Sequence, residues 1–317
     1  MNILMIGAGA VGVVYGWHLK QAGHNVVFYT KAKYEAEVSA GLTLHRITRR
    51  QTSRLDWAHP SVITTLDQVS AEPWDQVWLT IPSNALRHDD IAALLRAVGT
   101  ATIISLQPDI EDIDYVRAHI ADPAQVIQGL IPFISYQSPL PHTIEPKGIS
   151  YYLPPFSKGI YAGDAERLKG VLEALHAGGL SAKAVDDFHL ATAANTAFLQ
   201  PMIAALELNH WHLTDFPNTD SAKLGLAAAR EALAIVHQHS GAVTSPFRPL
   251  LWEKIWTLIV PLSQYLIPLP LEAYLQYHFT KVGAQTRVML DTYIKLGQQR
   301  GLAIEHLQQL RNKLQDA

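Results

Sequence analysis

The chain begins Met1-Asn2-Ile3-Leu4-Met5-Ile6-Gly7-Ala8-Gly9-Ala10-Val11-Gly12, and this stretch decides the fold. The apolar run of residues 2–6 predicts a strand, and the spacing of residues 11–21 predicts a helix after a G-x-G-x-x-G turn. In this context Gly7 allows the tight turn, Gly9 lets a ligand reach the backbone, and Gly12 lets helix and strand pack closely. The N–H groups that open the helix would receive a diphosphate, unless the turn serves packing alone. The predicted contacts are Gly7, Ala8, Gly9, Ala10, Val11 and Gly12.

Strand and helix patterns alternate through the rest of the first half. Apolar runs at residues 25–29, 76–81, 101–106 and 125–132 predict buried strands, and residues 89–98 and 110–120 have helical spacing. This alternation favours a parallel sheet with helices on both faces, the doubly wound Rossmann-type α/β fold. Further along, residues 148–153 and 159–162 suggest a strand pair joined by the Pro154-Pro155 turn, followed by a helix at 164–177.

The second half is predicted to be all helical. Strand signals end after Asp186, and helices are expected at residues 188–208, 221–239, 249–266, 271–300 and 304–314. We therefore predict a dinucleotide-binding Rossmann domain at residues 1–183 and an all-helical substrate and dimerisation domain at residues 184–317.

Composition and residue spacing disfavour nucleic-acid-binding, membrane-spanning and metal-binding proteins. The 317 residues carry a net charge of −3, which disfavours nucleic acid or an anionic membrane as the main partner. The absence of cysteine and of a secretory signal suits a cytoplasmic protein. Three prolines interrupt the most apolar stretch, residues 255–274, so a membrane span is not expected. No metal site is expected either, because the histidine pairs 210/212 and 237/239 have a spacing that points the rings to different helix faces.

The end of the second strand bears on the choice of cofactor. NAD-preferring domains place an acid there for the ribose 2′-OH, whereas this chain reads Tyr29-Thr30-Lys31-Ala32-Lys33. Lys31, Lys33 and the Thr30 hydroxyl are suited to a 2′-phosphate, which predicts NADP. The alternative is that the two lysines are solvated residues at a helix start.

These features resemble the ketopantoate reductase family (2-dehydropantoate 2-reductase). The resemblance rests on the opening motif, the Thr30-Lys31 strand end and the order of a Rossmann domain before a helical one. Leu106-Gln107 looks like the start of the family's Leu-Gln-Asn-Gly segment, Pro201 matches an Asn-Pro-Leu stretch, and residues 296–301 look like a closing Leu-Gly-x-x-x-Gly element. The resemblance implies an NADPH-dependent reductase of a 2-oxo acid, or of a related carbonyl or imine, that forms a homodimer.

The same comparison exposes departures at functional positions. Residues of other types stand where the family has its catalytic lysine, active-site asparagine, serine, glutamate and strand-end lysine: these are Thr192, Pro108, Ala273, Gln285 and Pro82. Loss of one donor to a developing alkoxide typically costs about 10²–10⁴ in rate. We therefore expect either a changed substrate or a catalytically silent NADP(H)-binding or redox-sensing protein.

Candidate site residues follow from this alignment. Thr192, Asn195 one helical turn later, and Gln285 are the catalytic candidates, and Pro82 and Gln107 join the cofactor-binding residues. His189 is a possible proton donor, and Lys254 is an alternative position for the lysine. Four arginines are candidates for binding a substrate carboxylate: Arg87, Arg230, Arg248 and Arg287.

Overall fold

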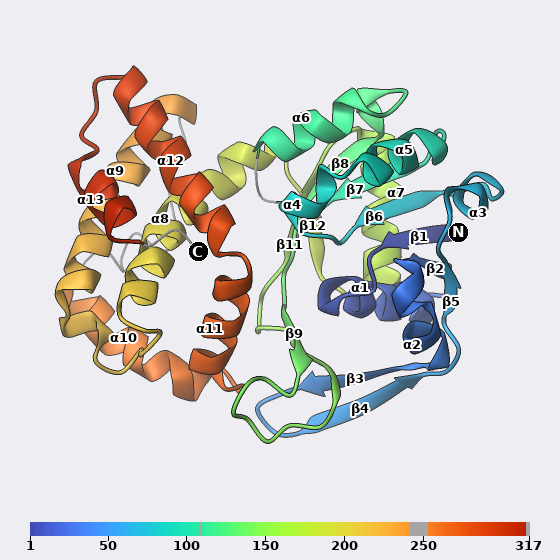
Figure 1. The fold of residues 1–317 in the computed structure, drawn as a ribbon, viewed down its shortest axis with the longest axis horizontal. Helices are drawn as coiled ribbons and strands as arrows, with labels where there is room; N and C mark the ends of the chain where they lie inside the picture. Colours follow the sequence, from blue (N-terminus) through green and yellow to red (C-terminus); the bar gives the residue numbers. More distant parts are fainter. Residues whose placement is uncertain (108–109, 241–252, 315–317) are drawn as a thin grey trace. The chain divides into compact units, whose positions relative to one another are not determined.

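The protein folds into two compact units (Figure 1). The structure, a computed structural model, describes residues 1–107, 110–240 and 253–314. The first unit comprises residues 1–139 and 144–188, and the second comprises residues 140–143 and 189–317.

An eight-stranded sheet forms the centre of the first unit. Its order is β12-β11-β8-β7-β6-β1-β2-β5, and all neighbours are parallel except β8 and β11. The strands are β1 (Asn2–Ile6), β2 (Asn25–Tyr29), β5 (Ser61–Ile63), β6 (Gln76–Leu79), β7 (Thr102–Ser105), β8 (Val126–Leu130), β11 (Gly159–Ala162) and β12 (Ala182–Ala184). Strand order reverses between β1 and β6, which is where doubly wound folds bind ligands.

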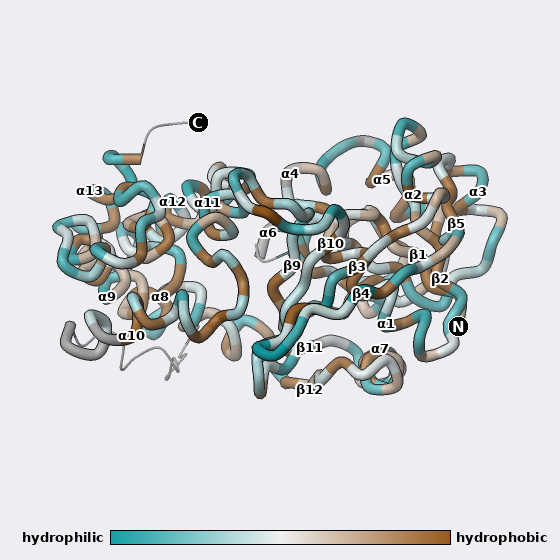
Figure 2. The backbone as a smooth tube through the Cα atoms, turned by 90° about the horizontal axis from the view of Figure 1, so that it is seen from below, coloured by the Kyte–Doolittle hydropathy of each residue, from teal (hydrophilic) through white to brown (hydrophobic). Residues whose placement is uncertain are grey.

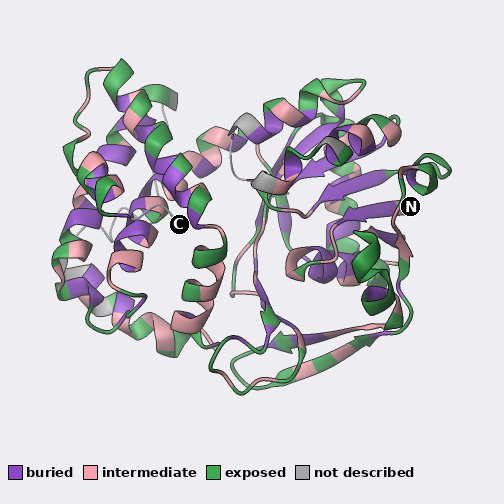
Figure 3. Cartoon of the chain, viewed as in Figure 1, coloured by how far each residue is buried: buried purple, intermediate pink, exposed green. Residues whose placement is uncertain are grey.

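Helices cover both faces of this sheet, which confirms the predicted Rossmann-type class. Alternate residues of β1 enter different cores: Ile3 and Met5 pack with α1 (Ala10–Gln21) and α7 (Ala165–Ala177), whereas Leu4 and Ile6 pack with the helices of the other face. Those helices are α3 (Leu66–Ser70), α5 (Asp89–Ala97) and α6 (Ile110–Ala118). Buried strands lie at the centre of the first unit in Figure 3, and the same strands are apolar in Figure 2.

A second, four-stranded sheet was not expected from the sequence. Its order is β4-β3-β10-β9, with β3 (Leu42–Ile47), β4 (Thr52–Trp57), β9 (Ile134–Ser138) and β10 (Gly148–Tyr152). The predicted pairing of residues 148–153 with 159–162 is wrong, because β10 pairs with β3 and β9 while β11 pairs with β8 and β12. Two short apolar runs in sequence order do not specify their hydrogen-bonding partners.

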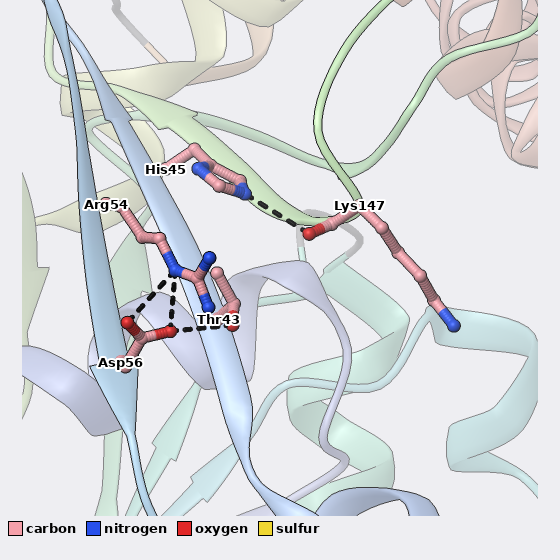
Figure 4. Close-up of polar contacts among 5 residues, drawn as sticks. All are labelled: Thr43, His45, Arg54, Asp56 and Lys147. Atoms are coloured by element: carbon pink, nitrogen blue, oxygen red, sulfur yellow. Dashed lines mark hydrogen bonds and ion pairs between the residues drawn. The ribbon is translucent and has the colours of Figure 1, made fainter.

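Polar side chains line the outer pair of this second sheet (Figure 4). Asp56 on β4 accepts from the Arg54 guanidinium at 3.0 Å and from the Thr43 hydroxyl at 2.9 Å. The hydrogen bond from Thr43, followed by that from Arg54, lowers the pKa of Asp56. His45 on β3 contacts the Lys147 carbonyl at 3.2 Å and so joins the strand to the loop before β10. The pair β3–β4 is therefore charged on an exposed surface, which discourages edge-to-edge association.

The second unit is built from helices, as predicted. The described helices are α8 (Phe188–Leu208), α9 (Asp220–Ser240), α10 (Glu253–Leu266), α11 (Leu271–Lys281), α12 (Gly283–Gln299) and α13 (Glu305–Lys313). The single helix expected at 271–300 is instead two helices separated at Val282. Buried Glu231 on α9 accepts N–H groups of His306 and Leu307 and so caps α13. Within the described residues, no helix is long and apolar enough to cross a membrane.

Candidate dinucleotide-binding site

The glycine turn lies at the reversal of strand order in the large sheet. Gly7 has φ +104, a conformation that side chains rarely adopt, and its N–H extends the β1–β2 pairing by donating to the Tyr29 carbonyl at 3.0 Å. A Cβ added to Gly12 would lie 2.3 Å from the Gly7 carbonyl oxygen. A side chain at either position would require a backbone shift. The lack of side chains therefore lets α1 pack close to the end of β1, as the sequence predicted.

Gly9 faces open space at the start of α1. It is the N-cap residue of the helix, it is exposed, and a Cβ added to it would meet no atom of the described residues within 4 Å apart from its chain neighbours. No side chain caps the helix and its first turn holds no acidic residue. The first N–H groups of α1 therefore lack intrahelical acceptors and present a partial positive charge. This open cradle fits the diphosphate of a dinucleotide.

Helix α1 is held by contacts with both sheets and with α7, which fix the direction of its N-terminus. The Tyr15 and Tyr161 hydroxyls are hydrogen-bonded at 3.0 Å, and the Tyr15 ring lies 4.9 Å from that of Trp78. His18 Nδ1 lies 2.7 Å from the carbonyl oxygen of Gly178 at the end of α7. The helix also packs on β9 and β10 of the second sheet. The second sheet thus holds the candidate phosphate-binding helix from the side opposite the first.

Burial of His18 is expected to make the stability of the first unit depend on pH. Burial lowers its pKa from the ordinary value of 6.5, the hydrogen bond to Gly178 opposes that change, and the nearby Arg46 charge adds to it. Above the unfolded pKa the neutral ring is compatible with the fold. As the pH falls below about 6.5 the unfolded chain takes up a proton first, so stability declines until the folded pKa is reached. We expect a slope of at most about 1.4 kcal/mol per pH unit from this group.

Hydrogen-exchange protection of β1 and β6 between pH 5 and 7.5 measures this effect. His18→Gln should flatten the decline, whereas His59→Asn, a change at an exposed histidine with φ 48, should not. An unchanged slope in His18→Gln would show that burial of His18 is not the cause.

The end of β2 carries the residues predicted for a 2′-phosphate. The Thr30 N–H donates to the Ile63 carbonyl at 3.1 Å, and the residue is largely buried. Lys31 is exposed, and among the described residues its ammonium has no hydrogen-bond or ion-pair partner. The Lys33 ammonium lies 4.7 Å from the Tyr34 ring centroid in a cation–π arrangement. Lys31 is therefore the cation most available to a ligand at this strand end.

Two predicted cofactor-binding residues, Pro82 and Gln107, follow the ends of β6 and β7. Pro82 is exposed, whereas Gln107 is buried. Pro82 caps α4 (Ser83–Leu86) with its carbonyl. Gln107 is only 6% exposed, and its amide donates to the Leu79 and Ile81 carbonyls at 3.1 and 2.8 Å. Thr80, which sequence reasoning missed, donates to the Ile6 or Gly7 carbonyl at 2.8 and 2.9 Å. Its only sequence signal is a small polar residue directly after an apolar strand.

The predicted catalytic residues lie on two helices of the second unit. Thr192 is buried on α8, and its carbonyl accepts from the Thr196 hydroxyl at 3.1 Å. Asn195 is half-buried one turn later, on the same side of the helix by its spacing. Gln285 is half-buried in the first turn of α12, where its N–H donates to the Val282 carbonyl. Helices α8 and α12 are joined by the pair Glu207–Arg287, with 2.9 Å between oxygen and nitrogen.

The arginines proposed for a substrate carboxylate are only partly available. Arg287 is buried and bound to Glu207 and the Gly283 carbonyl, and Arg87 is bound to the buried Asp112. Arg230 is exposed on α9. Arg248 and the side chain of Lys254 lie outside the described residues. In the parts of the chain that the structure describes, no group of three or more possible ligands could hold a metal ion.

Comparisons with known proteins support the family resemblance. Residues 3–150 match the family described as ketopantoate reductase PanE/ApbA. Among solved structures, 2-dehydropantoate 2-reductase from Geobacter metallireducens GS-15 has 17% identity and a TM-score of 0.68, with 98% of each chain covered. The enzyme of that name from Methylococcus capsulatus has 20% identity and a TM-score of 0.67, covering 98% of this chain and 95% of that one.

A second kind of enzyme shares the fold. The ternary structure of D-mandelate dehydrogenase with NADH and anilino(oxo)acetate has 14% identity and a TM-score of 0.69, covering 98% of this chain and 96% of that one. Among curated proteins none matches. The resemblance to the ketopantoate reductase family is confirmed over residues 3–150, and the likeness to solved structures supports a Rossmann-type fold with a helical second part.

Proposed function

We propose, from the match of residues 3–150 to the ketopantoate reductase family, that this protein is an NADP-dependent oxidoreductase. Its substrate would be a 2-oxo acid or a related carbonyl or imine compound. The observation that carries the proposal is the open cradle at Gly9, together with the exposed Lys31 ammonium at the neighbouring strand end. The helix N-terminus suits a diphosphate and Lys31 suits a 2′-phosphate.

The chain's own residues have two tasks in such a reaction, besides the hydride that the cofactor would supply. Bound NADPH supplies a hydride to the carbonyl or imine carbon of the substrate. The glycine turn and Lys31 hold the two ends of the adenosine diphosphate portion in place. A donor must then neutralise the negative charge that develops on the substrate oxygen or nitrogen. We assign this task to the Thr192 hydroxyl and the Asn195 amide, with Gln285 as a further polar contact.

The decisive experiment is a binding and turnover screen. Calorimetric titration with NADPH and NADH tests the cofactor site, and NADPH oxidation is then followed against a panel of 2-oxo acids and imines. Turnover of at least one compound supports the proposal. Tight NADPH binding with no turnover across the panel would contradict the enzymatic part of it.

A catalytically silent protein is the second candidate, one that binds NADP(H) or senses its redox state. It is favoured by the uncharged side chains of Thr192, Gln285 and Pro82, which stand where the resembling family has two lysines and a glutamate. A neutral hydroxyl is a weaker acid than an ammonium group, so proton transfer from Thr192 is intrinsically slower.

Substitution of Thr192 separates the two candidates. If the protein is an enzyme, Thr192→Val should lower kcat about 10- to 100-fold, the equivalent of one lost hydrogen bond to a charged group, with little change in KM for NADPH. Thr192→Ser should retain most of the activity. Gln285→Leu is expected to act in the same direction. Steady NADPH consumption that survives both substitutions would remove these residues from the proposed site.

The assembly and location of the protein complete the proposal. Helix α10 exposes Ile259, Leu262, Tyr265 and Leu266, an apolar surface that suits contact with a second copy in a homodimer. A chain without cysteine suits the reducing cytoplasm, and a small molecule is the expected partner of the site.

A further inference from the structure

A chain of hydrogen bonds joins the carboxyl ends of three neighbouring strands, β7, β6 and β1. Ser105, the last residue of β7, donates from its hydroxyl to the Gln107 side-chain oxygen at 2.7 Å. The Gln107 nitrogen donates to the Leu79 and Ile81 carbonyls, which flank Thr80. Ser105, Leu79 and Ile6 are aligned in register across the three strands. The hydrogen bonds therefore run along one edge of the sheet toward the glycine turn.

Thr80 connects this chain to the glycine turn itself. Its N–H donates to the Ile6 carbonyl at 3.1 Å, and its hydroxyl lies 2.8 Å from the same carbonyl and 2.9 Å from that of Gly7. A Cβ added to Gly12 would lie 2.5 Å from the Thr80 hydroxyl oxygen, and one added to Gly7 would lie 3.4 Å from it. The Thr80 hydroxyl thus occupies the space that these two glycines leave by lacking side chains.

Because these polar side chains are buried, the loss of any of their hydrogen bonds would cost stability. Ser105 is 1% exposed and Gln107 is 6% exposed. Both hydrogens of the Gln107 amide nitrogen have carbonyl acceptors, and its oxygen has the Ser105 hydroxyl. A buried polar group that loses its partner pays the cost of desolvation. Both the nitrogen and the oxygen of the Gln107 side-chain amide are therefore hydrogen-bonded within the protein.

The orientation of one peptide bond follows from the Thr80 contact. Gly7 lacks the steric restriction that other residues place on φ and ψ, so the peptide between Gly7 and Ala8 needs an external constraint. In a trans peptide the C=O and the next N–H point in opposite directions. Because the Gly7 carbonyl points at Thr80, the Ala8 N–H points away from it. If the peptide turned over, a carbonyl oxygen would replace an N–H group at the candidate phosphate site.

We propose that Ser105, Gln107 and Thr80 form a positioning network that holds the glycine turn in its anion-binding orientation. Dinucleotide affinity then depends on three residues that act through the backbone. This inference rests on the proposed function, because it assumes that the turn binds a dinucleotide. It also changes the role predicted for Gln107, from a cofactor contact to a positioning residue.

The test compares matched threonine substitutions on one sheet. Thr80→Val removes the hydroxyl with little change of volume and should weaken NADPH binding about 5- to 10-fold, as expected for a lost hydrogen bond. Thr80→Ser keeps the hydroxyl and should bind within about 2-fold of the original protein. The control is Thr102→Val, which removes a buried hydroxyl that accepts from Arg167 at 3.1 Å at the start of β7. It should lower stability without changing affinity.

A second measurement needs no ligand. Amide hydrogen exchange over residues 7–13 should become faster in Thr80→Val and stay unchanged in Thr80→Ser and Thr102→Val. Gln107→Met, which removes the amide, should loosen the same residues. Its effect on NADPH affinity should be less than additive with that of Thr80→Val, because both belong to one network.

The outcomes distinguish the inference from the proposed function. Failure of the original protein to bind either NADPH or NADH would overturn both. Binding by the original protein, with equal affinity in Thr80→Val and Thr102→Val, would overturn the network alone. Unchanged exchange over residues 7–13 in Thr80→Val would overturn it as well.

Discussion

Replacing Gly9 with alanine is expected to lower dinucleotide affinity at least about 100-fold while changing the stability of the fold by no more than about 1 kcal/mol. The backbone of Gly9, with φ −78, is open to any residue, and in the described part of the chain an added Cβ would meet nothing within 4 Å beyond its chain neighbours. The methyl group would instead occupy the space through which a diphosphate must approach the first N–H groups of α1. Charge-assisted hydrogen bonds to those groups would then be lost together.

Gly12 should behave differently although it belongs to the same motif. An alanine Cβ there would lie 2.3 Å from the Gly7 carbonyl oxygen and 2.5 Å from the Thr80 hydroxyl oxygen, so strand and helix must separate. We expect Gly12→Ala to destabilise the first unit by about 1–3 kcal/mol and to lose binding as a consequence. Gly9→Ala therefore tests a steric clash with the ligand, whereas Gly12→Ala tests a steric clash within the protein.

Gly170 provides the matched control. It lies in α7, and a Cβ added to it would likewise meet nothing within 4 Å. Gly170→Ala should leave affinity unchanged and raise stability by about 0.5–1 kcal/mol, because alanine favours a helix. Calorimetric titration with NADPH and thermal unfolding of the three variants measure both quantities. Full affinity in Gly9→Ala would show that the open face of the turn is not where the dinucleotide binds.

The parts of the fold that were predictable from sequence are those with local signals. The apolar run of residues 2–6 before three spaced glycines determines β1, the turn and α1 within a short stretch of chain. Asp164 accepts from the Arg167 N–H and caps α7, which ends at Gly178, so both ends of that helix are visible as single residues.

The second sheet had no such signal. Its strands come from residues 42–57 and 134–152, and β10 joins β3 to β9 across a long separation in sequence. Pairing of this kind depends on which surfaces remain uncovered once α1 has packed. The break between α11 and α12 was missed for a related reason. Val282 is an ordinary residue in a helical pattern, and Gly283 directly after it is a weak stop signal, because a single glycine is tolerated inside a helix.

The candidate site likewise contains residues with a local sequence signal and residues without one. Glycine spacing predicted the turn that the structure leaves open at Gly9, and the residues after β2 predicted Lys31 as a phosphate contact; both roles stay predictions. Thr80 was missed, because its contacts depend on the lateral order β7-β6-β1, which periodicity does not contain. Gln107 was placed at the site through its family position, whereas its partners are the Leu79 and Ile81 carbonyls.

The choice between NADP and NAD leads to the second large expected effect, at Lys31. Lys31→Ala should weaken NADPH binding about 10- to 100-fold, the range for a lost charge-assisted hydrogen bond to phosphate, and leave NADH binding within about 2-fold. The physical reason is that only NADPH carries the 2′-phosphate. Lys31→Glu should go further and favour NADH, because a carboxylate repels the phosphate and accepts from a ribose 2′-OH.

Lys33 is the control for this prediction, since it has the same charge two residues away. Its ammonium already lies over the Tyr34 ring, so Lys33→Ala should change NADPH affinity less than Lys31→Ala does. A D-mandelate dehydrogenase of the same fold is known with NADH, so the fold alone does not decide the cofactor. Titration of each variant with both dinucleotides at two salt concentrations measures the preference, because screening weakens the phosphate contact selectively. Equal affinity of the original protein for NADPH and NADH, unaltered in Lys31→Ala, would assign the site to NAD chemistry and leave Lys31 as a solvated residue at the start of a helical turn.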